Sequence, residues 1–189
     1  NRAGLNNYVI SNSAGVYGGG AYFQTSGQYV STNWDFAGWN FSGNFAVRDG
    51  GGIYQPRTLN HCTFTGNWAG GNGGGVCNSS STLIVISPCP FTGHRTSGPG
   101  GAAYAGSLIN CVIVGNQAGN SGGGVYGNIN NCVLSDNVAT INGGGVFIFS
   151  STGPIITCSN SFFTNNLAGN GGGVYNNVRE IVSNCVFFG

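Results

Sequence analysis

The chain has 189 residues with 5 basic and 4 acidic side chains, so its net charge is +1 and it has too few cations for the basic patches that bind nucleic acid or anionic lipid. It lacks the run of about 18 apolar residues that a membrane-spanning helix needs, so membrane insertion is not expected. The chain opens on Asn1 without a signal peptide, which favours a processed mature protein or a piece of a longer one. With 40% hydrophobic residues, it is expected to fold as one domain over residues 1–189.

A Gly-rich box, followed by an apolar anchor and usually an aromatic residue, recurs along nearly the whole chain. Successive anchors stand 21 to 32 residues apart, and a period of about 20 to 50 residues is typical of solenoids. The longer spacings predict loops after the first, third and sixth coils. The seven copies are Gly18–Tyr22, Gly50–Tyr54, Gly73–Cys77, Gly100–Tyr104, Gly122–Tyr126, Gly143–Phe147 and Gly171–Tyr175.

A polar residue precedes each anchor by nine positions, or by eight in the last copy. An inward amide at a bend can bond to the backbone and to the amide of the next coil, which satisfies groups that would otherwise be buried without partners. The pattern therefore predicts a structural ladder formed by Asn12, Asn44, Asn67, His94, Asn116, Asn137 and Asn166.

Apolar residues alternate with outward residues at period two before each ladder position, which predicts short strands. One inward column is Val9, Phe41, Phe64, Phe91, Ile113, Leu134 and Phe163. Two residues earlier stands a column of Cys62, Cys89, Cys111, Cys132 and, in the last copy, Cys185, with Ser161 interrupting it. Leu59, Ile86, Leu108, Ile129, Cys158 and Val182, three residues earlier again, are also expected to face inward.

The cysteine column allows three interpretations. Stacked coils lie about 4.8 Å apart, within the Cα range of a disulfide, so a vertical disulfide is possible. We favour buried thiols that pack as small hydrophobes, because side chains in one column point the same way; a metal site is the least favoured. Cys77 replaces an outward aromatic residue and is expected to be the accessible thiol.

These columns together predict an all-β chain, a single parallel β-helix of about seven to eight coils. One strand-rich turn cannot bury its own apolar face, whereas stacked copies form a continuous core in which like residues stack on like. The short strands lack the Asn-Gly hairpin signal, which favours parallel stacking over a sandwich.

The boxes resemble the repeats of polymorphic outer-membrane proteins and related bacterial right-handed β-helix passenger domains, which pair a Gly-Gly-Ala-Ile-like box with Phe-x-x-Asn. Phe41–Asn44, Phe64–Asn67 and Phe163–Asn166 match the second motif, and Phe91–His94 is a near match. The resemblance covers roughly residues 9–188, although most boxes here have three glycines where the family has two. It implies right-handed winding and a secreted or surface protein of adhesive or structural type.

Enzymes of the pectate-lyase and polygalacturonase kind share this architecture and use clustered carboxylates, so the acidic residues need inspection. The chain offers only Asp35, Asp49, Asp136 and Glu180. Asp35 and Asp49 fall in one long coil near Arg48, where a solvated loop is favoured over an acid–base couple. We expect no catalytic residues, no cofactor and no metal, and rank a polysaccharide-active lyase or hydrolase a distant third among functions.

The aromatic residues that follow the anchors are expected to face outward. We favour simple stacking along the solenoid over a surface that binds glycan or protein. This column is Tyr22, Tyr54, Tyr104, Tyr126, Phe147 and Tyr175. Asn40 and Asn78 fit the N-glycosylation pattern, which is a frequent chance match in an Asn-rich chain.

Neither end carries the polar cap that a solenoid needs to block its open edges. The tail ends in Phe187-Phe188-Gly189 just before a ladder position, and Asn1-Arg2 at the head restores the motif when it is written after that tail. A head-to-tail junction through these residues predicts an extracellular or cell-surface structural protein that polymerises with itself into a filament or sheath. The alternative is a surface adhesin that binds glycans or surface proteins.

Overall fold

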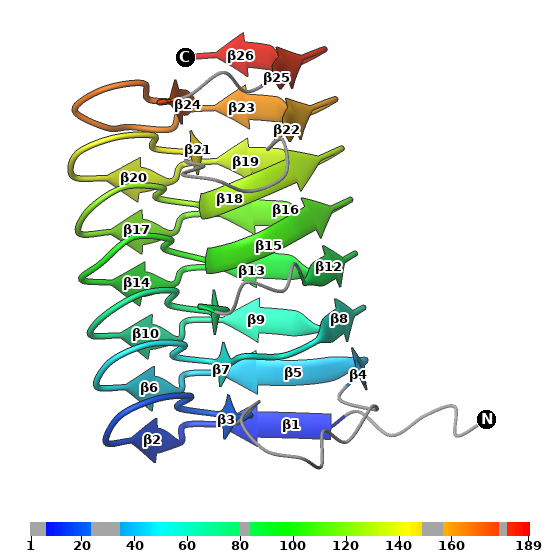
Figure 1. The fold of residues 1–189 in the computed structure, drawn as a ribbon, viewed down its shortest axis with the longest axis vertical. Helices are drawn as coiled ribbons and strands as arrows, with labels where there is room; N and C mark the ends of the chain where they lie inside the picture. Colours follow the sequence, from blue (N-terminus) through cyan, green and yellow to red (C-terminus); the bar gives the residue numbers. More distant parts are fainter. Residues whose placement is uncertain (1–6, 24–34, 80–83, 149–156, 178–180) are drawn as a thin grey trace.

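The computed structural model describes residues 7–23, 35–79, 84–148, 157–177 and 181–189, and every element in these ranges is a β-strand. The strands wind as a solenoid in which each coil lies directly on the one before it, with β1 at one end and β26 at the other (Figure 1). All strand pairs are parallel, as between β13 and β16 or β19 and β23. The predicted all-β parallel solenoid is confirmed. The described residues include no helix long and apolar enough to cross a membrane.

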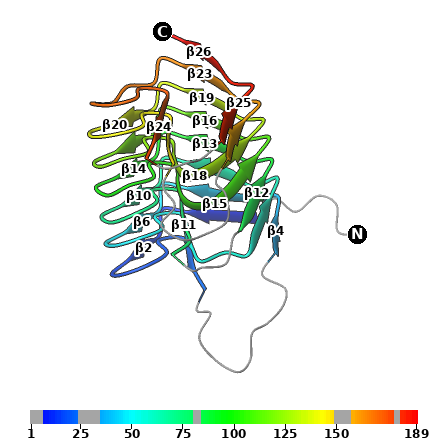
Figure 2. The ribbon, with the colours of Figure 1, turned by 45° about the horizontal axis from the view of Figure 1, so that its top comes forward.

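Three parallel sheets form the walls of the solenoid (Figure 2). Sheet A has β1 (Asn7–Ile10), β5 (Trp39–Ser42), β9 (Thr63–Thr65), β13 (Pro90–Thr92), β16 (Val112–Val114), β19 (Val133–Ser135), β23 (Phe162–Thr164) and β26 (Val186–Phe188). Sheet B has β2 (Ser13–Ala14), β6 (Phe45–Ala46), β10 (Trp68–Ala69), β14 (Arg95–Thr96), β17 (Gln117–Ala118) and β20 (Val138–Ala139).

Sheet C is the largest, because two rows of strands merge where single long strands serve both rows. Its first row has β3 (Ala21–Tyr22), β7 (Ile53–Tyr54), β11 (Val76–Cys77), β15 (Ala103–Ile109), β18 (Val125–Asn130), β21 (Val146–Ile148) and β24 (Val174–Asn176). Its second row adds β4 (Asp35–Ala37), β8 (Thr58–Asn60), β12 (Val85–Ser87), β22 (Thr157–Ser159) and β25 (Ile181–Ser183). The long strands β15 and β18 join the two rows.

The coil count is slightly lower than the seven to eight expected, because six coils have strands in all three sheets. In the seventh coil sheet B is reduced to an isolated bridge at Leu167, and the eighth coil contributes only β25 and β26 to the sheets. In the seventh coil Val174 follows Asn166 by eight positions, where in other coils the anchor follows the ladder residue by nine, and this shortening accompanies the loss of the strand. The right-handed winding stays a prediction that rests on the resemblance.

The core is a set of vertical columns in strict register. Phe64 pairs with Phe41 and Phe91, and Ile113 pairs with Leu134, so residues from consecutive coils stack on one another. The Phe64 and Phe91 rings are 4.8 Å apart and nearly parallel, and both are fully buried. One coil alone cannot provide this repeated contact, which matches the spacing of about 4.8 Å between hydrogen-bonded parallel strands.

Each coil turns through corners whose residues have positive φ. One column of corners is the first glycine of every box, and a second lies directly before the ladder: Ser11, Gly43, Gly66, Gly93, Gly115, Asp136 and Asn165. A third lies directly before the cysteine column: Gly38, His61, Asn110, Asn131, Asn160 and Asn184. Gly and Asn dominate because they tolerate the left-handed region at low cost.

The second glycine of the box is required for a different reason, which is close backbone approach. A Cβ added to Gly74 would lie 2.5 Å from the carbonyl oxygens of both Arg95 and Gly101. These oxygens belong to the next coil, so any side chain here would push two coils apart.

Candidate functional site: the interior ladders and the open C-terminal end

The seven predicted ladder residues lie in one column at the corner between sheets A and B. Asn137 shows the full pattern, since its Oδ1 accepts hydrogen bonds from the backbone N (3.0 Å) and Nδ2 (2.9 Å) of Asn116. Its own Nδ2 donates to the Ile113 carbonyl (2.9 Å) and to Asn166 Oδ1 (2.9 Å). The five middle members are buried, whereas Asn12 is exposed and Asn166 half-buried at the ends of the column.

His94 interrupts this ladder. Its Nδ1 accepts a hydrogen bond from the backbone N of Asn67 at 2.9 Å, so the proton of the neutral ring is on Nε2. The Nε2 atom is buried and has no hydrogen-bond partner among the described residues. Burial lowers the pKa of His94 to about 4, because the charged ring would be desolvated. The residue is therefore neutral at physiological pH.

The cysteine column forms a second ladder of weaker bonds. The thiols of Cys111 and Cys132 donate to the carbonyls of Ile86 and Leu108 in the preceding coils, each at 3.4 Å. Ser161 occupies the same position, and its hydroxyl accepts from the backbone N of Cys132 at 3.1 Å. All the thiols are free; Cys62, Cys89, Cys111 and Cys132 are buried and Cys185 is half-buried.

The prediction that the aromatic column faces solvent is wrong for two of its members. Tyr22 is 45% exposed, but Tyr54 is only 7% and Phe147 only 8% exposed, so these two rings are buried. Flat stacking covers the rings: Tyr126 lies 4.7 Å from Tyr104 and 5.0 Å from Phe147, and the latter lies 5.4 Å from Tyr175. The stack, which was the favoured interpretation, leaves little aromatic surface free for a ligand.

Cys77 is also not the accessible thiol that the sequence predicts, because it is fully buried. It pairs with Tyr54 below and Tyr104 above in sheet C, so two larger side chains enclose the smaller one. Burial raises the pKa of its thiol well above the usual range, which makes it unreactive. Among the seven cysteines, Cys185 is the one with partial exposure.

Asp35, Asp49 and Asp136 lie on separate elements of the described structure. Asp35 begins β4, on the opposite side of the coil from the turn between β6 and β7 that carries Asp49 (Figure 1). Asp49 is buried, and its Oδ1 accepts a hydrogen bond from the backbone N of Asn72 at 2.7 Å, a structural role in the turn. Asp136 is a corner residue whose Oδ1 accepts from Asn165 Nδ2 at 3.4 Å, and Glu180 lies outside the described residues.

The two candidate glycosylation sites are poorly placed for a sugar. Asn78 is buried, and Asn40 is half-buried with its Oδ1 fully enclosed. An attached glycan must project into solvent, so the folded coil disfavours modification at both positions.

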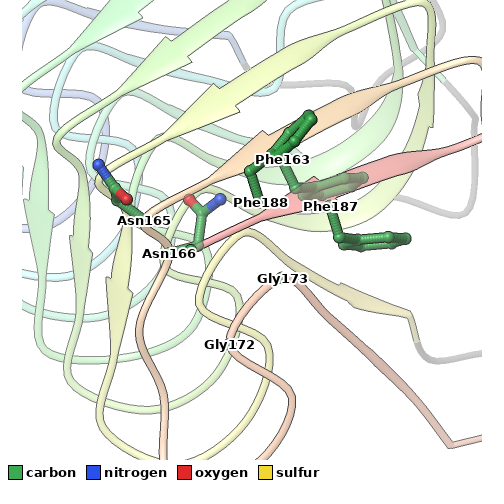
Figure 3. Close-up of a pocket in the computed structure, with 8 residues that line it drawn as sticks. Phe163, Asn165, Asn166, Gly172, Gly173, Phe187 and Phe188 are labelled. Carbon is green, nitrogen blue, oxygen red and sulfur yellow. The ribbon is translucent and has the colours of Figure 1, made fainter.

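At the C-terminal end of the solenoid, core columns open to solvent. Phe187 stacks on Phe163 at 4.8 Å, yet it is 50% exposed because no ring covers its other face. Phe188 is 62% exposed beside it. A cavity of about 240 Å³ opens here (Figure 3) and is lined by Phe163, Asn165, Asn166, Gly172, Gly173, Phe187, Phe188 and Gly189.

The opposite end presents β1, which pairs only with β5 among the described strands. Val9 is half-buried on Phe41, while Tyr8 is 58% and Ile10 is 54% exposed. Asn1 and Arg2, the head of the predicted junction, lie outside the described residues. Phe187, Phe188 and Gly189, its tail, form the exposed end face.

A feature that sequence reasoning missed is an apolar stripe on the outer face of sheet A. We define it as Pro90, Val112, Val133, Phe162 and Val186, which are exposed and lie in register on five consecutive strands. The signal was present, since these are the outward residues next to the cysteine column.

Comparison with known proteins agrees with the repeat pattern. Residues 40–56 and 61–79 match the model of the Chlamydia polymorphic membrane protein repeat, and each match contains one Phe-x-x-Asn motif and one Gly-rich box. No curated protein and no solved structure matches the chain. The chain is thus a parallel β-helix repeat protein whose second and third coils carry the polymorphic membrane protein repeat.

Proposed function

We propose that this chain is a surface-exposed, non-enzymatic structural protein whose β-helix is extended by end-to-end stacking on a second copy. The matched repeat supports a surface-exposed protein associated with an outer membrane. The exposed C-terminal face carries the stacking part of the proposal, because Phe187 stacks on Phe163 at the end of a continuous apolar column and is half-uncovered.

Every interface between coils inside the chain serves as a template for this contact. Such an interface consists of parallel backbone bonds, stacked core side chains and ladder amides, as between the coils of Asn116 and Asn137. The edge of β26 offers backbone groups and the Phe187 side chain to a further strand, and an unpaired edge is a site for strand addition. A second copy of the chain is the occupant whose first strand has the matching column pattern.

The strand register of the contact follows from the columns. Phe187 belongs to the column of Phe41 and Phe163, and Val9 is the first member of that column. Placing β1 of the next copy on β26 puts Val9 over the open face of Phe187. Asn1 precedes Asn12 by only 11 positions, whereas ladder residues of a bare coil are 21 positions apart. At such a junction the residues before Asn12 would therefore supply about half a coil.

Electron microscopy of the purified chain at neutral pH tests this proposal. Stacking predicts unbranched fibres with an axial repeat of about 34 to 38 Å, from seven or eight coils at about 4.8 Å each. A chain that sediments as a monomer at high concentration and shows only short rods would overturn it.

A second candidate is a surface adhesin, and the apolar stripe favours it. The stripe spans five coils of sheet A and stays exposed in the single chain, which suits a protein partner better than a glycan. Saturable binding of the labelled chain to intact cells, lost in Val112→Asp but kept in Thr63→Asp, would support this function. Thr63 is a matched control because it lies in the same row of sheet A outside the stripe.

A further inference from the structure

Two cysteines from different columns meet in the last two coils. Cys158 lies in β22 in the column of Ile129 and Val182, and Cys185 ends the cysteine column directly before β26. Their sulfur atoms are 3.7 Å apart, and the Cys185 thiol also points at the Cys158 carbonyl at 3.6 Å. Each earlier cysteine of the column lies against an apolar residue of the preceding coil, such as Phe36 or Leu108, whereas Cys185 lies against a second cysteine.

We propose that Cys158 and Cys185 are a disulfide-forming pair that covalently joins the last coil to the one before it. The two residues are 27 positions apart, so the bond would close a loop that contains β23, β24 and β25. This inference does not depend on the proposed function, because it concerns the chemistry of one chain.

The solvent exposure of the two thiols determines which one reacts first with an oxidant. Cys185 is half-buried and Cys158 fully buried, so a soluble disulfide such as oxidised glutathione meets Cys185 first. The Cys185 thiolate attacks one glutathione sulfur, forming a mixed disulfide and releasing one glutathione thiolate. The Cys158 sulfur then attacks Cys185 Sγ, its proton passes to the second departing glutathione, and the protein loses two electrons and two protons in total. The two sulfur atoms, now 3.7 Å apart, approach to about 2.05 Å as the bond forms.

Other thiols of the chain lack this combination. Cys62, Cys89, Cys111 and Cys132 are stacked in one column and buried at every level, and Cys77 is enclosed between two tyrosines. An oxidant in solvent therefore reaches none of these five before it reaches Cys185. Partial exposure of Cys185 and its contact with Cys158 therefore single out this pair among the seven cysteines.

The chain offers a convenient readout, because trypsin cleaves after Arg179 and leaves Cys185 as the one cysteine of peptide 180–189. The reduced full-length chain is incubated with oxidised glutathione, acid-quenched, alkylated, digested and analysed by mass spectrometry. We expect peptide 180–189 to be linked to peptide 96–179 in most molecules, with a mass lower by two hydrogens, and to be released by reductant.

Substitutions identify which cysteine is linked to Cys185, and a control variant tests whether the loss of a core thiol alone prevents the link. Cys158→Val introduces the residue type found next in that column and should abolish the link, as should Cys185→Ser. Cys132→Ser mimics the natural Ser161 in the cysteine column and should keep it, with circular dichroism verifying the fold of each variant. Full alkylation of Cys185 in the oxidised wild type, a stable glutathione adduct, a link that survives Cys158→Val, or a dimer joined through two 180–189 peptides would overturn the proposal.

Discussion

At the scale of single residues, His94 is the point where the interior ladder is weakest. It provides one acceptor, where an Asn at this position of the ladder provides an acceptor and two donors. Its Nε2 proton is buried without an acceptor among the described residues, a loss that costs about 1 to 3 kcal/mol. The chain tolerates this because the coils on either side are fully bonded through Asn67 and Asn116.

The pH dependence of stability follows from this burial. The pKa of His94 falls from 6.5 to about 4 in the folded chain, so between these values the unfolded chain binds more protons. The free energy of unfolding should therefore be constant above pH 6.5, and fall as the pH drops towards 4 by at most about 1.4 kcal/mol per pH unit. Urea denaturation at a series of pH values measures this slope.

His94→Asn should remove the slope and raise stability by about 1 kcal/mol at neutral pH, because an Asn restores the amide contact to Asn116. His61→Asn is the matched control, since His61 is exposed and its ring is hydrogen-bonded to the neighbouring Asn60, and it should keep the slope. A slope that persists in His94→Asn would show that another group carries the acid sensitivity.

Substitution should destabilise the chain more at the second glycine of a box than at a corner glycine before the ladder. Gly74→Ala forces a Cβ against backbone oxygens of the next coil and should cost about 1 to 3 kcal/mol, since backbone cannot move aside as a side chain can. Gly66 has φ +58° and open space around its Cα, and Asn165 occupies the equivalent corner with φ 52°. Gly66→Asn should therefore change the unfolding free energy by less than about 1 kcal/mol. Equal losses in thermal denaturation would contradict this distinction.

At the scale of one coil, the Asn column acts as a continuous hydrogen-bonded element. Asn137→Ala removes the acceptor for two groups of Asn116 and the donor to Ile113, all buried. We expect a loss of about 3 to 5 kcal/mol in the free energy of unfolding, from about 1 to 3 kcal/mol for each group left without a partner. Chemical denaturation measures the loss.

Asn137→His is the informative comparison, because His94 shows which contacts a histidine keeps in this column. It should cost clearly less than Asn137→Ala, since Nδ1 still accepts from the backbone N of Asn116. If the two variants lost the same stability, the backbone bond would contribute little and the amide ladder would be the main term.

Much of the fold was predictable at this scale because each column repeats one chemical requirement. The Asn ladder, the Phe column and the parallel stacking follow from period and residue type alone. The burial of Cys77 and Tyr54 was not predictable, because alternation places both residues outward. Cys77 lies between Tyr54 and Tyr104, and the Tyr17 ring stacks on Tyr54 at 4.5 Å. The close approach of Cys158 and Cys185 was also missed, since it joins two columns and not two members of one.

At the scale of the whole molecule, the exposed C-terminal end face and the apolar stripe of sheet A lead to predictions that can be tested separately. The end face closes if copies stack. The apolar stripe lies on the outer face of sheet A, whose strands run along the side of the solenoid (Figure 1), so it stays open in any stack. A filament and an adhesin are therefore compatible uses of one surface protein, and point substitutions can separate them.

Phe187→Asp places a charge on the open core column and should abolish fibres, because stacking would bury the carboxylate without a partner. Phe187→Leu keeps an apolar residue of the kind that Leu134 contributes to the same column, and should keep the fibres. Val112→Asp lies on the side of sheet A and should leave fibres intact while it abolishes binding to cells. Negative-stain microscopy and sedimentation velocity of the three variants, each verified as folded by circular dichroism, provide the measurement. Fibres that survive Phe187→Asp would mean that association proceeds through the side of the solenoid, and the stripe would then be the interface.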